Sequence, residues 1–134
     1  MWGEINMCDD KKTKKYIAML KTMIAYDEMN DYLDDFIKNH QDDNLIEQIR
    51  LLQDYNIMLQ HHDELFGRLI LRHEYDNSRT CLLCKKVYLY QAASLARKIA
   101  ESVNDFDTSV HKTLEYDIVE TGHIMDVISY QLDV

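Results

Sequence analysis

The sequence lacks proline altogether and has only three glycines in 134 residues. All-β folds depend on these residues, because they form the turns that recur every ~8–12 residues between short strands. Their scarcity therefore excludes a turn-rich β-sandwich or barrel. Hydrophobic residues make up 46% of the chain, a fraction typical of globular proteins. We predict a single, mostly helical domain over residues 1–134.

Positive charge is also scarce, since 15 Lys and Arg residues stand against 24 Asp and Glu residues, giving a formal net charge of −9. Proteins that bind a long phosphate backbone use clustered Lys and Arg side chains to displace its counterions. Nucleic acid is therefore not expected as the main partner.

Long hydrophobic runs are missing as well. No stretch approaches the ~20 apolar residues of a membrane span, so we expect no direct span. The first residues, Met1 to Glu4, lack the apolar run of a signal peptide. Three cysteines, Cys8, Cys81 and Cys84, are an odd number, which paired disulfides would not leave. We expect a reduced, intracellular protein.

What is present is helical periodicity in four regions, where apolar residues recur every three or four positions. In order, these regions cover residues 16–37, 45–71, 81–103 and 110–128. We expect the first to break near Asn30 and the last to be interrupted near Gly122. The region 81–103 has apolar residues on several sides, a pattern typical of a helix in the middle of a bundle.

Polar stretches separate these regions and are expected to form loops that also cap the helices. They cover residues 39–44, 74–79 and 104–108, with Asp107 or Thr108 as a helix cap. The predicted fold class is thus an all-α bundle around a central apolar helix.

Three short patterns contain residue types that bind metals. Cys81 and Cys84 have the spacing of half a zinc site, His61-His62-Asp63 is found in metal phosphohydrolases, and His111 with Glu115 is found in di-iron bundles. Each pattern lacks the further ligands that such sites need. We therefore interpret the cysteines as buried free thiols and the other residues as solvated helix faces, and we expect no cofactor or metal.

Arg68, His73 and Tyr75 form a pattern that resembles the active-site signature of HEPN-type ribonucleases, which are small all-α proteins. In such an enzyme Arg68 would hold the scissile phosphate and His73 would perform acid–base chemistry. This is an enzymatic alternative to a protein that only binds other proteins.

Gly67 lies inside an apolar stretch in which alanine would be about 1 kcal/mol better for a helix, which suggests close approach by another segment. With its neighbours it gives an aromatic-Gly-Arg sequence, Phe66-Gly67-Arg68. An arginine beside a missing side chain can pair with a carboxylate delivered by a docking helix.

On these residues the chain resembles the Bcl-2 family of apoptosis regulators, and its compact viral members from large DNA viruses in particular. Residues 64–70 look like the family's first homology motif, in which aromatic-Gly-Arg opens the central helix. Residues 93–105 with 111–118 are similar to the segment leading into the second motif, and residues 49–54 look like the third.

The resemblance implies a hydrophobic groove that captures the amphipathic BH-3 helix of host pro-apoptotic proteins and so inhibits apoptosis without catalysis. By position, the groove would comprise Ile49, Leu52, Tyr55, Leu65, Phe66, Gly67, Arg68 and Leu69. Arg68 would pair with the aspartate of the BH-3 ligand.

The resemblance leaves two further alternatives open. The same fold in some viral relatives blocks innate immune signalling instead, and an apolar groove could also pair two copies of the chain into a homodimer. In either case the expected location is the host cytoplasm, with recruitment to mitochondria through partners.

Overall fold

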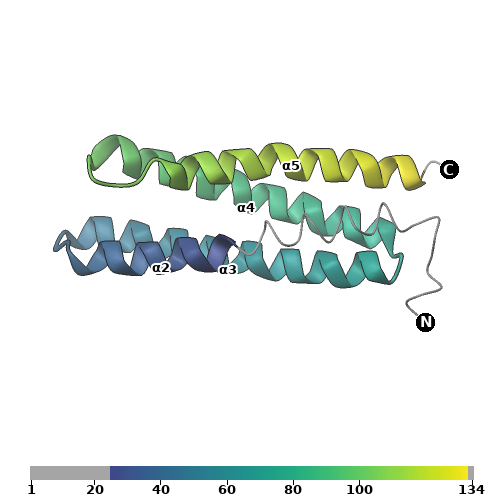
Figure 1. Cartoon of the computed structure of the whole chain (residues 1–134), viewed down its shortest axis with the longest axis horizontal. Coiled ribbons are helices and arrows are strands. Elements are labelled where there is room, and N and C mark those ends of the chain that lie inside the picture. The colour runs from purple at the N-terminus through teal and green to yellow at the C-terminus, as the bar shows by residue number, and fades with distance from the viewer. Residues whose placement is uncertain (1–24, 133–134) are drawn as a thin grey trace.

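A computed structural model describes residues 25–132 of the chain (Figure 1). Within this range every regular element is a helix and there is no strand, so the all-α prediction is confirmed. The part of the first predicted helix before Ala25 and Cys8 lie outside the described residues. The helices are α2 (Ala25–Lys38), α3 (Asp43–Leu71), α4 (Tyr75–Ser102) and α5 (Ser109–Leu132).

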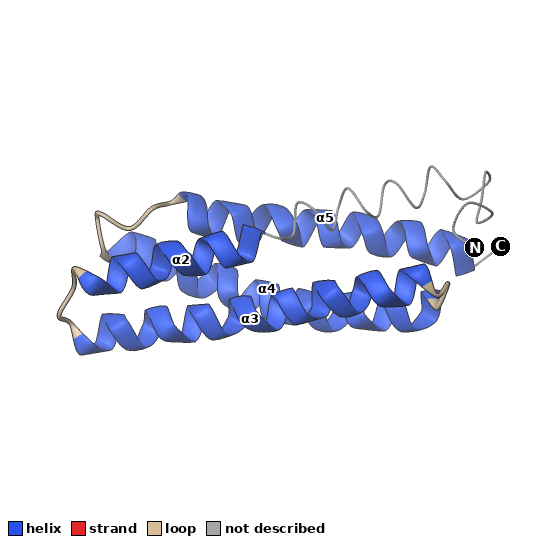
Figure 2. Cartoon of the chain, turned by 60° about the horizontal axis from the view of Figure 1, so that its bottom comes forward, coloured by secondary structure: helices blue, strands red, loops and turns tan. Residues whose placement is uncertain are grey.

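The helices lie side by side along one long axis, because short loops turn the chain back on itself three times (Figure 1). At 29 residues, α3 is about 44 Å long. The loops 39–42 and 103–108 meet at one end of the bundle, which we call the two-loop end (Figure 2). The loop 72–74 lies at the opposite, one-loop end.

Helix boundaries follow from local hydrogen bonds. The Asp42 carboxylate accepts the backbone N–H groups of Asn44 (3.0 Å) and Leu45 (3.3 Å), which caps α3. The same helix ends where the Glu74 N–H donates to the Leu69 carbonyl at 2.9 Å and His73 adopts a left-handed φ of 58°. This is a Schellman ending with histidine in the position that usually holds glycine.

Both predicted helix breaks are wrong, since α2 runs through Asn30 and α5 runs through Gly122. Asn30 needs no break because α3 satisfies its side chain: the Asn56 amide donates to Asn30 Oδ1 at 2.8 Å, and Asn30 Nδ2 donates to the Gln53 carbonyl at 3.3 Å. Gly122 is tolerated because the helix around it buries Ile124 and Ile128 completely, which outweighs a penalty of about 1 kcal/mol.

The buried apolar residues form two clusters along the bundle axis. The first core cluster lies toward the two-loop end and draws residues from all four helices and from Phe106 in the loop. The second core cluster lies toward the one-loop end and consists of Phe66, Ile70, Cys81, Leu82, Ile124 and Ile128.

The prediction that residues 81–103 form a helix in the middle of the bundle is confirmed only in part. Helix α4 packs against both α3 and α5, yet Leu83, Val87 and Tyr90 on its outer side stay about half exposed. Its apolar residues on several sides thus reflect one core face and one exposed apolar face.

Candidate functional site

The residues predicted to line a groove lie on one helix, α3, and on opposite sides of it. Ile49, Leu52 and Phe66 are fully buried in the core, and Gly67 is buried as well. The prediction that they line an open groove is therefore wrong for these four residues, because they supply the helix's core-facing stripe.

The Phe66-Gly67-Arg68 sequence also has a different place from the one that the resemblance implies. It lies in the last turns of α3, which ends at Leu71, and it opens no helix. Arg68 and Leu65 point away from the core and are exposed, while Tyr55 and Leu69 are half-buried at its edge.

Large apolar side chains gather instead on the outer side of α3 and α4. Leu51, Met58 and Leu65 recur every seven residues on α3 and are each about half exposed. On α4 the exposed residues recur at spacings of four and three. We call this surface the α3/α4 face, formed by Leu51, Tyr55, Met58 and Leu65 of α3 and by Leu83, Val87, Tyr90 and Leu95 of α4.

A shallow hollow of about 530 Å³ lies at one end of the α3/α4 face. Leu51 and Tyr55 line it from α3, and Tyr90, Leu95 and Lys98 line it from α4. The hollow exists because two antiparallel helices meet there and leave a groove between their side chains.

The floor of this face is held by ring contacts between the two helices. The Tyr88 ring lies 6.4 Å from the Tyr55 ring and 5.6 Å from the His62 ring, measured between centroids. Lys86 Nζ lies 6.0 Å from the centroid of the Tyr90 ring, in cation–π range, at the outer margin. The Tyr88 contacts hold α3 and α4 together beneath this surface.

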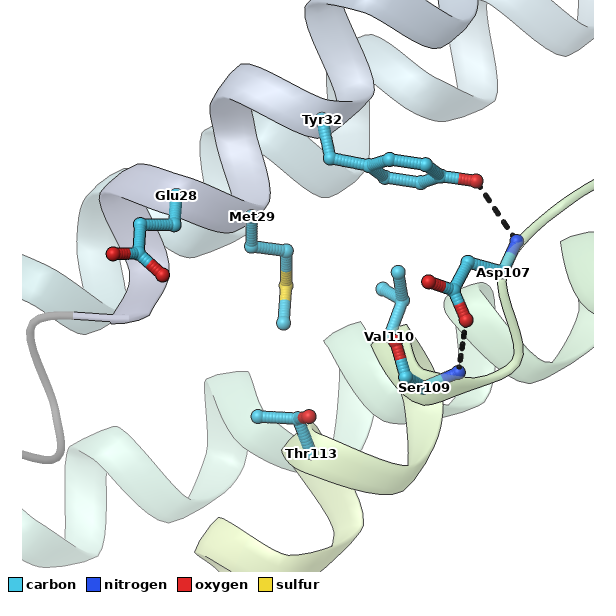
Figure 3. A pocket seen from close by; sticks show the side chains of 7 residues that line it. All are labelled: Glu28, Met29, Tyr32, Asp107, Ser109, Val110 and Thr113. Carbon is cyan, nitrogen blue, oxygen red and sulfur yellow. Dashed lines mark hydrogen bonds between the residues drawn. The ribbon is translucent and has the colours of Figure 1, made fainter.

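A second hollow of about 250 Å³ lies between α2 and the start of α5 at the two-loop end (Figure 3). Two hydrogen bonds join its walls: the Asp107 N–H donates to the Tyr32 hydroxyl at 2.8 Å, and the Ser109 N–H donates to the Asp107 carboxylate at 2.9 Å. The Ser109 hydrogen bonds lower the pKa of Asp107, as in a helix cap. These hydrogen bonds join the α4–α5 loop to α2 and cap the start of α5.

A charged cluster is buried between the two core clusters. Lys85, which is completely buried, places Nζ 2.7 Å from Asp63 Oδ1 and 3.1 Å from Asp117 Oδ2. The Tyr26 hydroxyl donates to the same Asp117 oxygen, Oδ2. The expectation that Asp63 lies on a solvated helix face is wrong, because its side chain is buried against Lys85 between α3, α4 and α5.

The structure also shows where the other residues considered as metal ligands lie. The prediction of buried thiols is confirmed for Cys81 and wrong for Cys84, which is exposed. The Cys81 thiol donates to the His62 carbonyl at 3.2 Å, and burial raises its pKa to about 11. His111 is buried rather than solvated and lies 3.3 Å from Glu115. Within residues 25–132, no three His, Cys, Asp or Glu side chains gather closely enough to hold a metal ion.

Two members of the ribonuclease-like pattern come together at the one-loop end. His73 Nδ1 lies 2.8 Å from the Tyr75 hydroxyl. Arg68, one turn before the end of α3, is exposed. The pattern thus places a His–Tyr pair in an exposed loop.

No helix between residues 25 and 132 is both long enough and apolar enough to cross a bilayer. Searches of protein-family models, curated proteins and solved structures with this chain find no match.

Proposed function

We propose that this chain is a non-enzymatic interaction protein that binds an amphipathic helix on its α3/α4 face. Following the resemblance to the Bcl-2 family, the proposed ligand is the BH-3 helix of host pro-apoptotic proteins, and its capture would inhibit apoptosis. The observation that carries the proposal is the line of half-exposed large apolar side chains on two neighbouring helices, with a hollow between them.

The dimensions of the face suit a helix. From Leu51 to Leu65 it extends along α3 for about 21 Å, which is four turns of a bound helix. A BH-3 helix presents apolar anchors at i, i+3 or i+4 and i+7. Those anchors would lie between the α3 row and the α4 row, with one of them in the hollow beside Tyr90.

Basic residues stand at both ends of this face. Lys98 lines the hollow, and Arg68 lies one turn beyond Leu65 on the exposed side of α3. Arg68 remains the proposed partner for the ligand's aspartate. Because it is exposed, its ion pair would set the register of the ligand and contribute only ~0–1 kcal/mol.

The test is a calorimetric titration of the protein with a panel of BH-3 peptides, using two matched variants. Val87 on the α3/α4 face and Val119 on the outer side of α5 are 56% and 54% exposed. Val87→Lys should weaken binding at least tenfold, about 1.4 kcal/mol, because it places a charge among the apolar anchors. Val119→Lys should leave the affinity unchanged.

Failure of every BH-3 peptide to bind would overturn the proposed ligand class. Equal losses in Val87→Lys and Val119→Lys would overturn the proposed surface. Changing the aspartate of the best peptide to alanine should have a smaller effect than Val87→Lys, since it removes only an exposed ion pair.

A further inference from the structure

The buried charged cluster joins all four described helices at one level of the bundle. Lys85 is on α4, Asp63 on α3, Asp117 on α5 and Tyr26 on α2. Thr121, one turn after Asp117, also donates to its carboxylate at 3.5 Å. Lys85 thus links three helices through its two ion pairs, and no other buried polar side chain in residues 25–132 does so.

The charges in this cluster do not balance when every group is ionised. Two carboxylates share one ammonium, which leaves one negative charge in the interior, where water cannot solvate it. The Lys85 contact reaches only Asp63 Oδ1, and the buried second oxygen, Oδ2, has no hydrogen-bond partner within the described residues. One proton on a carboxyl group would restore neutrality.

The geometry favours Asp63 as the group that takes this proton, because Asp117 also accepts hydrogen bonds from Tyr26 and Thr121, which stabilise its ionised form. The burial of Asp63 raises its pKa to about 7; Lys85 opposes the rise, while Asp117 and Glu64 add to it. Tyr26 stays protonated, because burial and the neighbouring Asp117 raise its pKa. The titratable groups that face Asp63 are Tyr26 from α2, Glu64 from its own helix, Cys81 and Lys85 from α4, and Asp117 from α5.

The charged cluster also lies at the boundary between the two core clusters. On α3, Asp63 lies between Leu59 of the first core cluster and Phe66 of the second. On α4, Lys85 lies between Leu82 and Leu89 in the same way. A change of charge here acts where the two apolar clusters join.

We propose that the Asp63–Lys85–Asp117 cluster is a proton-controlled lock: α3, α4 and α5 are held together while Asp63 is protonated, and they loosen at this level when it ionises. The lock is independent of the proposed helix binding. It makes the bundle sensitive to pH changes around neutrality.

The direction of the pH effect follows from proton linkage. An unfolded chain would release the Asp63 proton near pH 4, whereas the folded chain keeps it to about 7. Between these values the folded state binds more protons, so Asp63 makes stability fall as pH rises. His62 acts in the opposite sense, because burial and Lys85 lower its pKa, and a comparison of variants removes its contribution.

The test compares urea unfolding of the wild type, Asp63→Asn and Asp54→Asn at pH 5.5 and 8.5. Asp54 is an exposed aspartate on the same helix and serves as the matched control. Relative to Asp63→Asn, the wild-type folded-to-unfolded ratio should fall by roughly 10- to 100-fold between these pH values. Asp54→Asn should follow the wild type.

Local opening of the bundle is measured separately, by amide hydrogen exchange. Exchange rates at each pH are divided by the intrinsic rate at that pH, so that only changes in protection are compared. Protection of α5 around Asp117 should fall with rising pH in the wild type and stay constant in Asp63→Asn. Carboxyl NMR of the wild type covers the case in which Asp63→Asn does not fold: titration of Asp63 near pH 7 supports the lock. Titration at or below pH 4, or parallel pH profiles of the wild type and Asp63→Asn, would overturn it.

Discussion

The two ends of the bundle are held together in different ways. At the two-loop end, Phe36 packs edge-on against Phe106 with ring centroids 5.1 Å apart, and His40 stacks on Phe36 at 4.0 Å. Asp42 and Asp107 both accept backbone N–H groups at the starts of helices there. At the one-loop end, Glu74 precedes α4 without a side-chain cap, and His73 has a left-handed backbone.

This difference shows where the fold is secured. Aromatic packing and helix caps together determine how the loops meet at the two-loop end. Toward the other end, the described core draws on α3, α4 and α5 alone. The buried charged cluster lies between the first and second core clusters and connects the helices there.

The largest expected effect comes from removing the cation that joins the two halves. Lys85→Met would leave the negative charge of the Asp63–Asp117 pair buried without a counter-charge, so we expect a loss of about 3–5 kcal/mol in the free energy of unfolding. Urea denaturation at neutral pH measures it. Replacing all three residues together, as Asp63→Leu, Lys85→Met and Asp117→Leu, should restore most of the loss, since no charge is then buried. A loss below 1 kcal/mol for Lys85→Met would contradict the cluster.

A matched pair of leucines compares the two core clusters directly. Leu89 and Leu82 are both completely buried, seven residues apart on α4. Truncation of either to alanine should cost about 2–5 kcal/mol, because each leaves a cavity. Leu89→Ala should cost about 1 kcal/mol more, since its cluster includes side chains from α2 that hold the cavity open. Equal thermal and urea midpoints for the two variants would remove the distinction between the clusters.

The smallest expected effect is a gain toward the one-loop end. A Cβ atom on Gly122 would meet nothing within 4 Å, so alanine fits without strain. Gly122→Ala should raise the free energy of unfolding by about 0.5–1 kcal/mol, because alanine loses less backbone entropy in a helix. Thermal unfolding would show it as a higher midpoint, and a lower midpoint would indicate a close contact at that position.

Helical periodicity predicted most of the fold. Apolar spacing located the helical regions within the described residues, and two of the three polar stretches, 39–44 and 104–108, mark loops, because both signals are local. The third, 74–79, was wrongly predicted as a loop, since α4 already begins at Tyr75. The predicted helix breaks at Asn30 and Gly122 were wrong because contacts between residues far apart in the sequence stabilise both helices. The Asn30 side chain donates to the Gln53 carbonyl and accepts from the Asn56 amide, both on α3, and no local rule contains those partners.

The candidate site was harder to predict, because exposure depends on how the helix is oriented in the bundle. Once 45–71 is treated as a single helix, Ile49, Leu52 and Phe66 fall on one side while Leu65 and Arg68 fall on another. A search for charges on apolar stripes would also have found Lys85, since it lies four residues from both Cys81 and Leu89. The hollow beside Tyr90 depends on the pairing of α3 with α4, and no local pattern predicts it.

The most direct test of the proposed function is to map where a BH-3 peptide touches the protein by amide chemical-shift changes during titration. The account predicts that the shifted signals cluster on residues 51–65 of α3 and 83–98 of α4, and that the outer side of α5 around Val119 stays unchanged. Shifts confined to α5, or an absence of shifts with every peptide, would contradict it.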